Sequence, residues 1–356
     1  MSKRINFVRF SVKEQTLFAK RLSFLVKAGV PILECLHLIR KQTRSRAKGR
    51  IFEQVIKDVS NGQYLASSLQ KHGRFFGGFA INLIRVGETS GVLSQNLAYL
   101  ADELHKKHAL RRKVVGALVY PIFITVATLG LTTILTAYIF PKLMPIFGSL
   151  GVNLPLTTRI LISVSAYLRE WGILTLILFI VFLVGVFALR ANIKTVRYYL
   201  DYFILRIPIA GSIAVTYNLT NFTRTLGLML RSGVPLTEAL AITAETTPNL
   251  VYRAAYVRMA RGVTKGEQIS RTLEREPKLF PDVLTHLVAI GEKTGNLSTT
   301  LTYLAELYEA EVEEKTKNLS SSIEPVLMIT MGVIVGLIAV SVITPIYEIT
   351  QHLSPR

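Results

Sequence analysis

The chain has 356 residues, of which 50% are hydrophobic and 18% are charged, and its mean hydropathy is +0.39. This composition is too apolar for an ordinary soluble domain and is the opposite of a disordered chain. The 42 Lys and Arg outnumber the 23 Asp and Glu, giving a net charge of +19 that favours an anionic partner, and one cysteine excludes an intramolecular disulfide.

Three charge-free apolar stretches are candidates to cross a bilayer, which takes roughly 20 residues per helix. They cover residues 114–140, 172–189 and 325–347. The second is short, but Trp171 and Arg190 at its ends are side chains that anchor well at a membrane interface. The sequence therefore predicts a polytopic membrane protein with three spans.

Basic residues set the expected orientation, because cytoplasmic segments near spans retain Lys and Arg. Residues 1–113 hold 22 basic and 7 acidic residues, residues 190–321 hold 16 and 13, and residues 141–171 hold only 3 basic residues. No apolar signal segment follows the basic amino terminus, so we expect that terminus in the cytoplasm and the carboxyl terminus on the external side of the membrane. The expected order is a first cytoplasmic bundle, a span, an external loop, a span, a second cytoplasmic bundle, a span and an external tail: residues 1–113, 114–140, 141–171, 172–189, 190–321, 325–347 and 348–356.

An internal repeat supports this topology. Shifting the chain by about 204 residues aligns the segment that starts at Phe18 with the segment that starts at Phe222, and identical pairs continue into the membrane as far as Pro141 and Pro345. The repeated unit is a polar domain followed by one membrane helix. Two such units would face opposite sides of the membrane without another crossing, and the unpaired middle span supplies it.

Each polar domain shows helical periodicity. Leu93, Leu97, Leu100 and Leu104 recur at the spacing of one helix face, and strand signals are absent. The segment that begins at Ser11 has the spacing of a capping box. We expect an all-α protein with about six short helices in each bundle, the last of which continues without a breaker from Leu93 towards the membrane.

Two turns occur in both repeats. The first is the GVP turn, in which glycine suits a helix end and proline suits the start of the next helix, an architectural role. The second is GExxG, in which two glycines flank a carboxylate; it either shapes a turn or lets Glu88 and Glu292 contact a subunit or a basic partner. The candidate turn and interface residues are Gly29, Pro31, Gly87, Glu88, Gly91, Gly233, Pro235, Gly291, Glu292 and Gly295.

The ends of the spans carry a second group of marked residues. Prolines bracket the first and third spans, which implies a kink or close packing. Glu324 lies at the edge of the third span, where it either contacts another helix or sits at the interface. The group consists of Tyr120, Pro121, Pro141, Glu324, Pro325 and Pro345.

Signatures of catalysis are missing from the sequence: there is no GxxxxGK, GxGxxG, HExxH or GxSxG. His105 and His108 lie three apart, but the two lysines between them disfavour a cation, and a solvated helix face explains them. We therefore expect no enzymatic activity, cofactor or metal site.

These residues and motifs together resemble the type II secretion F family, the inner-membrane platform proteins of type IV pilus, type II secretion and competence machines. The resemblance rests on Tyr120 and Pro121 in the first span, on Pro141 at its far end, on the paired GVP and GExxG turns, and on Glu324 and Pro325. It covers nearly the whole chain. The short tail before Phe18 departs from members that use a long tail to contact other machine parts.

The resemblance implies a homo-oligomer that docks a cytoplasmic secretion or pilus-assembly ATPase and passes pilin-like subunits into a filament, alongside other inner-membrane components. The basic first bundle suggests contact with anionic lipid or with an acidic ATPase face through Arg44, Arg46 and Lys48, unless its charge only fixes topology. The alternatives are a transporter, for which the spans lack charged groups, and a membrane-tethered DNA-binding component, for which a stacking platform is not evident.

Overall fold

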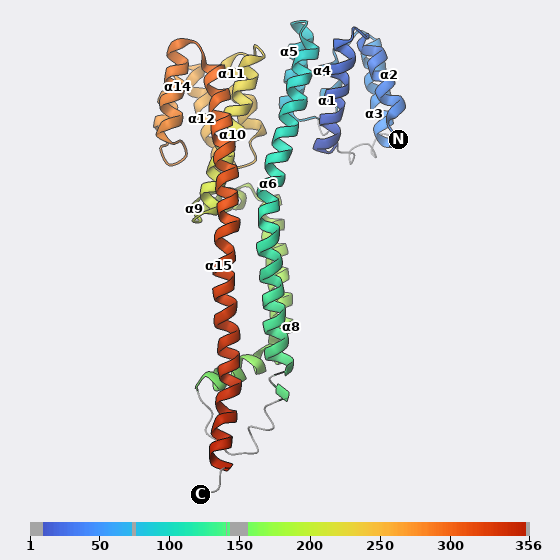
Figure 1. Cartoon of the computed structure of the whole chain (residues 1–356). Coiled ribbons are helices and arrows are strands. Elements are labelled where there is room, and N and C mark those ends of the chain that lie inside the picture. Colours follow the sequence, from blue (N-terminus) through green and yellow to red (C-terminus); the bar gives the residue numbers. More distant parts are fainter. Residues whose placement is uncertain (1–9, 73–75, 140, 143–155, 354–356) are drawn as a thin grey trace. The chain divides into compact units, whose positions relative to one another are not determined.

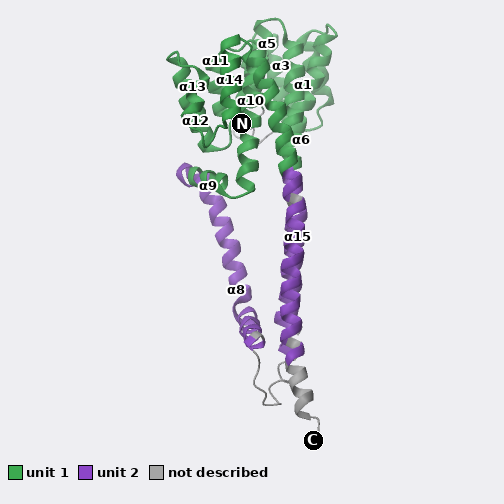
Figure 2. Cartoon of the chain, turned by 60° about the vertical axis from the view of Figure 1, so that its left-hand side comes forward, with its two compact units in different colours: residues 1–113, 198–315 green, residues 114–197, 316–356 purple. Residues whose placement is uncertain are grey.

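A computed structural model describes residues 10–72, 76–139, 141–142 and 156–353, and every regular element in these residues is a helix (Figure 1). The chain forms two compact units (Figure 2). The first comprises Met1–Lys113 and Tyr198–Lys315, so the two predicted bundles pack into one body. The second comprises Val114–Arg197 and Thr316–Arg356. The predicted all-α class is confirmed.

The first repeat contains the six helices that the sequence predicts. The capping box is present at the start of the first: Glu14 N–H donates to the Ser11 hydroxyl, and Ser11 N–H donates to the Glu14 carboxylate. Both bonds satisfy amide groups that an uncapped helix would leave open. The helices are α1 (Val12–Lys27), α2 (Ile32–Gln42), α3 (Arg46–Ser60), α4 (Leu65–Gln70), α5 (Gly78–Thr89) and α6 (Leu93–Ile134).

The second repeat follows the same order. Its helices are α10 (Ala210–Arg231), α11 (Leu236–Thr246), α12 (Leu250–Thr264), α13 (Ile269–Glu274), α14 (Asp282–Thr294) and α15 (Leu297–Leu353). A further helix, α9 (Lys194–Arg206), precedes them and meets α10 at a bend of 110°. Although the bent pair is apolar, most of α10 is buried in the core of the second repeat, so α10 serves as a core helix.

The cores of the two repeats use aromatic residues at equivalent positions. In the first repeat the ring of Phe18 lies 5.8 Å from that of Phe52 and 5.0 Å from that of Phe76. In the second the residues 204 positions later do the same: the ring of Tyr256 lies 4.5 Å from that of Phe222 and 6.1 Å from that of Phe280. All six side chains are buried. The duplication therefore extends from sequence to core packing.

Three helices are long and apolar enough to cross a membrane, and they include the three predicted spans. The first is α6, followed by a π-helical turn η2 (Leu135–Ile139); the second is α8 (Leu156–Asn192); the third is α15. Both α6 and α15 begin in a polar domain and continue without interruption into an apolar stretch, as predicted. The segment predicted as an external loop is helical from Leu156, because the apolar pattern that precedes Trp171 extends α8.

Hydroxyl groups join the helices of the second unit. Ser165 on α8 donates to the carbonyl oxygen of Thr136 in η2 at 2.7 Å, and Thr158 on α8 donates to the carbonyl oxygen of Ser341 on α15 at 2.9 Å. All four residues are buried. A carbonyl oxygen carries two lone pairs, so it can accept a hydroxyl hydrogen bond from a neighbouring helix in addition to its bond within its own helix.

Candidate functional site

The GVP turns have the same geometry in both repeats. Gly29 has φ +81° and Gly233 has φ +83°, a conformation that glycine adopts without strain. Pro31 and Pro235 directly precede α2 and α11 with φ −55°. These residues join the first two helices of each repeat, which supports the architectural interpretation.

The carboxylates of the GExxG turns cap a helix in their own repeat. Glu88 accepts the backbone N–H groups of Leu65 at 2.6 Å and Ala66 at 2.9 Å, at the start of α4. Glu292 accepts those of Ile269 at 2.6 Å and Ser270 at 3.0 Å, at the start of α13. A negative charge at a helix amino terminus is stabilising, and here it also satisfies two open donors.

The two glycines of each GExxG turn have different tasks. A Cβ on Gly87 would lie 2.9 Å from the Cα of Leu93, and a Cβ on Gly291 would lie 2.8 Å from the hydroxyl of Thr300. The first glycine therefore lets two helices approach closely. The last glycines, Gly91 and Gly295, have φ +73° and +71° and reverse the chain.

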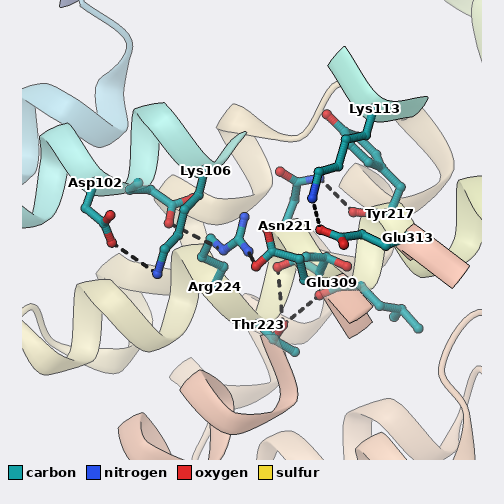
Figure 3. Close-up of polar contacts among 12 residues, drawn as sticks. Asp102, Lys106, Lys113, Tyr217, Asn221, Thr223, Arg224, Glu309 and Glu313 are labelled. Atoms are coloured by element: carbon teal, nitrogen blue, oxygen red, sulfur yellow. Dashed lines mark hydrogen bonds and ion pairs between the residues drawn. The ribbon is translucent and has the colours of Figure 1, made fainter. Parts of the chain in front are cut away.

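The GVP and GExxG motifs thus act within their own repeats, and the contact between repeats is made by other side chains. Its centre is Arg224 on α10 (Figure 3). Arg224 Nε lies 3.6 Å from Glu103 Oε2 on α6, and Arg224 Nη2 donates to Glu309 on α15. Both Arg224 and Glu103 are buried. One cation thereby joins the last helices of both repeats.

Burial raises the pKa of Glu103 from 4.5 to about 7, and the positive charge of Arg224 opposes the rise. Lys107 and Lys106 on the same helix act in the same direction as Arg224, and Asp102 acts against them. The loss of hydration is therefore larger than the attraction between the paired charges, as is common for buried ion pairs.

Three further contacts complete the interface between the repeats. The guanidinium of Arg231 lies 4.9 Å from the centre of the Tyr99 ring, a cation–π contact. Lys113 on α6 pairs with Glu313 on α15 at the last residues of the first compact unit (Figure 3). Helix α5 also packs against α11. The first repeat thus presents α5 and α6 to α10, α11 and α15 of the second.

Residues that are identical in the two repeats do not reveal the cluster of Arg224, Glu103 and Glu309. Glu103 aligns with Leu307, Arg224 with Lys20, and Glu309 with His105, so none of the three is repeated. The available signal is the mismatch itself: at position 103 the first repeat has an acidic residue where the second has Leu307.

The three basic residues suggested as a contact have different environments. Lys48 pairs with Glu14 and lies 5.1 Å from the centre of the Phe10 ring, so it is engaged inside its domain. Arg44 and Arg46 are exposed beside Ser45, which caps α3. The first turn of α3 holds no acidic residue, although acidic groups are the favoured ones there.

The marked residues of the spans are placed as follows. Pro121 is buried inside α6, which continues through it, and the Thr125 hydroxyl bonds its carbonyl oxygen at 2.8 Å. Tyr120 is exposed, as are Glu324 and Pro325 on α15. Pro141 is partly buried, and the side chain of Pro345 lies outside the described residues. The sequence predicts a kink or close packing at Pro121; α6 continues through Pro121, and the burial of this residue fits close packing.

Within the part of the chain that the structure describes, no group of three His, Cys, Asp or Glu side chains is arranged to hold a metal ion. Cys35 is buried, and burial raises the pKa of its thiol. Its equivalent in the second repeat is Ala239, also buried, which fits a packing role.

A duplicated helical domain with each copy leading into an apolar helix defines a polytopic membrane protein built from two homologous halves. Comparison with known families gives the same division: the model of type II secretion system protein F matches residues 18–141 and again residues 222–345, two segments offset by 204 positions. These matches cover more than half of the chain. The chain belongs to the type II secretion system protein F family.

Relatives from two kinds of machinery align over nearly its full length. The chain is 36% identical to the type IV pilus assembly protein PilC of Thermus thermophilus, across 96% of this chain and 84% of that protein. It is 33% identical to the type II secretion system protein F of Pseudomonas aeruginosa, across 98% and 86%. It is 31% identical to the type IV pilus assembly protein TapC of Aeromonas hydrophila, across 94% and 80%. The family is one of structural platform proteins and not a known enzyme family.

Proposed function

We propose that this chain is an inner-membrane platform that converts motion of a cytoplasmic ATPase into displacement of pilin-like subunits in the bilayer. In this proposal the two helical bundles, residues 1–113 and 190–321, face the cytoplasm, and the carboxyl terminus lies outside. The names of its relatives, pilus assembly proteins and a secretion system protein, support a role in such machines.

The observation that carries the coupling is the continuity of two helices. Helix α6 runs from Leu93 to Ile134 and α15 from Leu297 to Leu353, each passing from a polar domain into an apolar stretch. A continuous helix transmits rotation or tilt more stiffly than a flexible linker, because each residue is tied to the next turn by backbone hydrogen bonds. The pair formed by Lys113 and Glu313 would make the two helices move together.

The energy must come from elsewhere in this scheme, since the sequence contains none of the nucleotide-binding motifs that an ATPase uses. An external ATPase therefore has to engage the polar domains. Exposed basic residues such as Arg44 and Arg46 are candidates for that contact.

A pair of insertions between Lys113 and Val114 tests the coupling. A flexible GSGSGSG insert should stop filament assembly while leaving membrane insertion and oligomerisation intact. A helical AEAAKAA insert of the same length adds about two turns and nearly keeps the helix phase, so it should retain substantial assembly. Normal assembly with the flexible insert would show that stiff transmission through α6 is unnecessary.

A further inference from the structure

The two repeats contact each other head to tail. The first repeat uses α5 and α6, whereas the second uses α10 and α11, the equivalents of α1 and α2, together with the side of α15 that carries Glu309 and Glu313. The faces left exposed are α1 and α2 of the first repeat, and α14 with the side of α15 that carries Tyr303 and Leu307 in the second.

We name these faces by their residues. The first-helix face of the first repeat consists of Leu17, Lys20, Phe24, Lys27, Leu38 and Lys41. The long-helix face of the second repeat consists of Asp282, Val283, Ile290, Tyr303 and Leu307. All eleven residues are exposed in the single chain.

The first-helix face exposes apolar side chains. The equivalent residues on α10 and α11 of the second repeat are buried or partly buried. Phe24 is 72% exposed, while Leu228 at the equivalent position is half-buried against the first repeat. Leu38 is 41% exposed, while Ile242 is 4% exposed. Leu17 is also exposed and stands where the second repeat has the partly buried Asn221. Exposed leucine and phenylalanine side chains gathered on one face are typical of a surface that another protein covers.

The long-helix face shows the same contrast. Val283 and Ile290 on α14 are 54% and 55% exposed, whereas Phe79 and Val86 at the equivalent positions on α5 are half-buried. Tyr303 on α15 is 58% exposed, whereas its equivalent Tyr99 is half-buried beneath Arg231. The two leftover faces thus expose the positions that the internal interface covers.

The charges on the two faces are complementary at the positions that the internal interface brings together. A Cβ on Gly78 would lie 3.5 Å from Glu245 Oε2, which places residue 78 of the first repeat beside residue 245 of the second. The residues equivalent to these two are Asp282 and Lys41, an acid and a base. Likewise Lys27 stands in the place of Arg231, so it would meet Tyr303 as Arg231 meets Tyr99.

The two exposed faces carry no equivalent of the buried ion pair between Arg224 and Glu103. Leu307 replaces Glu103, and Leu17 replaces Asn221, while Lys20 replaces Arg224. A lysine can extend its charged end to water while its stem covers apolar surface, so a buried carboxylate is not needed there.

We infer that the long-helix face of one copy binds the first-helix face of another, so that the contact between copies repeats the contact between the two halves of one chain. Such an interface is heterologous, and it either closes into a ring or continues as an open chain. Because a membrane holds all copies in one orientation, successive copies are related by rotation about the membrane normal. This inference does not depend on the proposed coupling function.

Disulfide crosslinking in native membranes tests the pairing in the full-length chain. The background is Cys35→Ala, the residue that the second repeat has at the equivalent position. Copies that carry Lys41→Cys and one affinity tag are expressed with copies that carry Asp282→Cys and a second tag. Oxidation should join the two tags covalently, because the equivalent residues of the internal interface lie side by side.

The controls separate this interface from others. Lys41→Cys with Lys41→Cys, and Asp282→Cys with Asp282→Cys, should crosslink at least tenfold less, because only a two-fold symmetric interface brings like residues together. Lys57→Cys, on an exposed part of α3, should not pair with Asp282→Cys. The reversals Lys41→Glu and Asp282→Lys should each lower the yield of oligomer, and the double reversal should restore it.

Several outcomes would overturn the proposal. These are crosslinks dominated by like pairs, crosslinks of both cysteines only to other proteins, or oligomers that form equally well with either charge reversal alone. Filament assembly is measured separately, because the inference concerns only the contact between copies.

Discussion

Arg224 Nε lies 3.6 Å from Glu103 Oε2, and both side chains are buried where the first repeat meets the second. The same guanidinium donates to Glu309, so two carboxylates from two long helices share one cation. Burial of the Glu103 carboxyl outweighs the attraction of Arg224, and this is why the pKa of Glu103 is raised to about 7.

The raised pKa predicts a stability that depends on pH. Between about pH 4.5 and about pH 7 the folded chain keeps a proton on Glu103 that the unfolded chain has lost. The contribution of the Glu103 carboxyl to the free energy of unfolding is therefore fully present below about pH 4.5 and is lost as the pH rises towards 7. Glu103→Gln removes the titration, so its unfolding free energy relative to the native chain should rise over this interval by up to about 3 kcal/mol.

Chemical unfolding of both proteins in detergent across this pH interval measures the difference. Comparing two variants cancels the titrations they share, including that of Asp58, whose pKa the adjacent Lys71 lowers. Glu34→Gln, an exposed neutral change on α2, alters none of the groups that act on Glu103 and should leave the profile unaltered. Parallel profiles for the native chain and Glu103→Gln would mean that this carboxyl titrates as an ordinary surface group.

The capping role of the GExxG glutamates predicts that a substitution loosens only the helix start in its own repeat. The equivalent helix start in the other repeat then serves as the control. Glu88→Gln removes the charge and one acceptor oxygen, so the start of α4 should open more easily, by about 1–2 kcal/mol. Hydrogen exchange should quicken at Leu65 and Ala66 and stay unchanged at Ile269 and Ser270. Glu292→Gln should do the reverse. Exchange that quickens equally in both repeats would point to a role outside these caps.

The two glycines of the first GExxG turn should tolerate different residues. Gly91 has φ +73° and open space around it, and asparagine adopts this conformation readily, so Gly91→Asn should cost about 1 kcal/mol or less. Gly87 has an ordinary φ but no room, because a Cβ would meet the Cα of Leu93 at 2.9 Å, which is backbone. Gly87→Ala should therefore destabilise by about 1–3 kcal/mol or more, in line with other overpacked positions. Thermal unfolding of both variants checks this, and equal sensitivity at the two sites would contradict the assignment.

Much of the architecture could be predicted from the sequence because its signals are local or repeated. Capping residues, αL glycines and helical periodicity act over a few residues, and a fixed offset of 204 positions needs only the chain itself. The extent of α8 was missed because its apolar window is shorter than the helix, which starts at Leu156. The packing of both bundles into one body depends on side chains that differ between the repeats.

One ion pair shows why a comparison of aligned positions in the two repeats can overlook a conserved interaction. In the first repeat Lys71 pairs with Asp58 at 2.8 Å. In the second, Arg275 replaces Lys71, but Gly262 replaces Asp58, which suggests that the pair is lost. Instead Glu267 reaches back, so that a Cβ on Gly262 would lie 3.0 Å from its carboxylate, and Arg275 pairs with it at 2.9 Å. The carboxylate that pairs with the basic residue therefore occupies a similar place in both repeats, although in the second it belongs to a residue five positions further along the chain.

The last prediction concerns the exposed basic residues at the start of α3. Arg44→Glu with Arg46→Glu should weaken the association of the purified protein with its ATPase about tenfold at low salt. The loss should shrink at high salt, where exposed charges are screened. Arg50→Glu with Lys57→Glu changes the charge by the same amount further along the same helix and should have a smaller effect. Lys48→Glu is unsuitable as a control, because it places a second acid beside Glu14 and would disturb the domain.

Membrane orientation, read by labelling an introduced external cysteine, separates this contact from a role of the charges in topology alone. If the basic residues only fix topology, both double variants should shift the orientation to a similar degree, and ATPase association should follow the correctly oriented fraction. If Arg44 and Arg46 form the contact, correctly oriented protein should still bind the ATPase weakly. ATPase binding that is unchanged across salt concentrations in the Arg44 and Arg46 variant would leave these two residues with no part in docking.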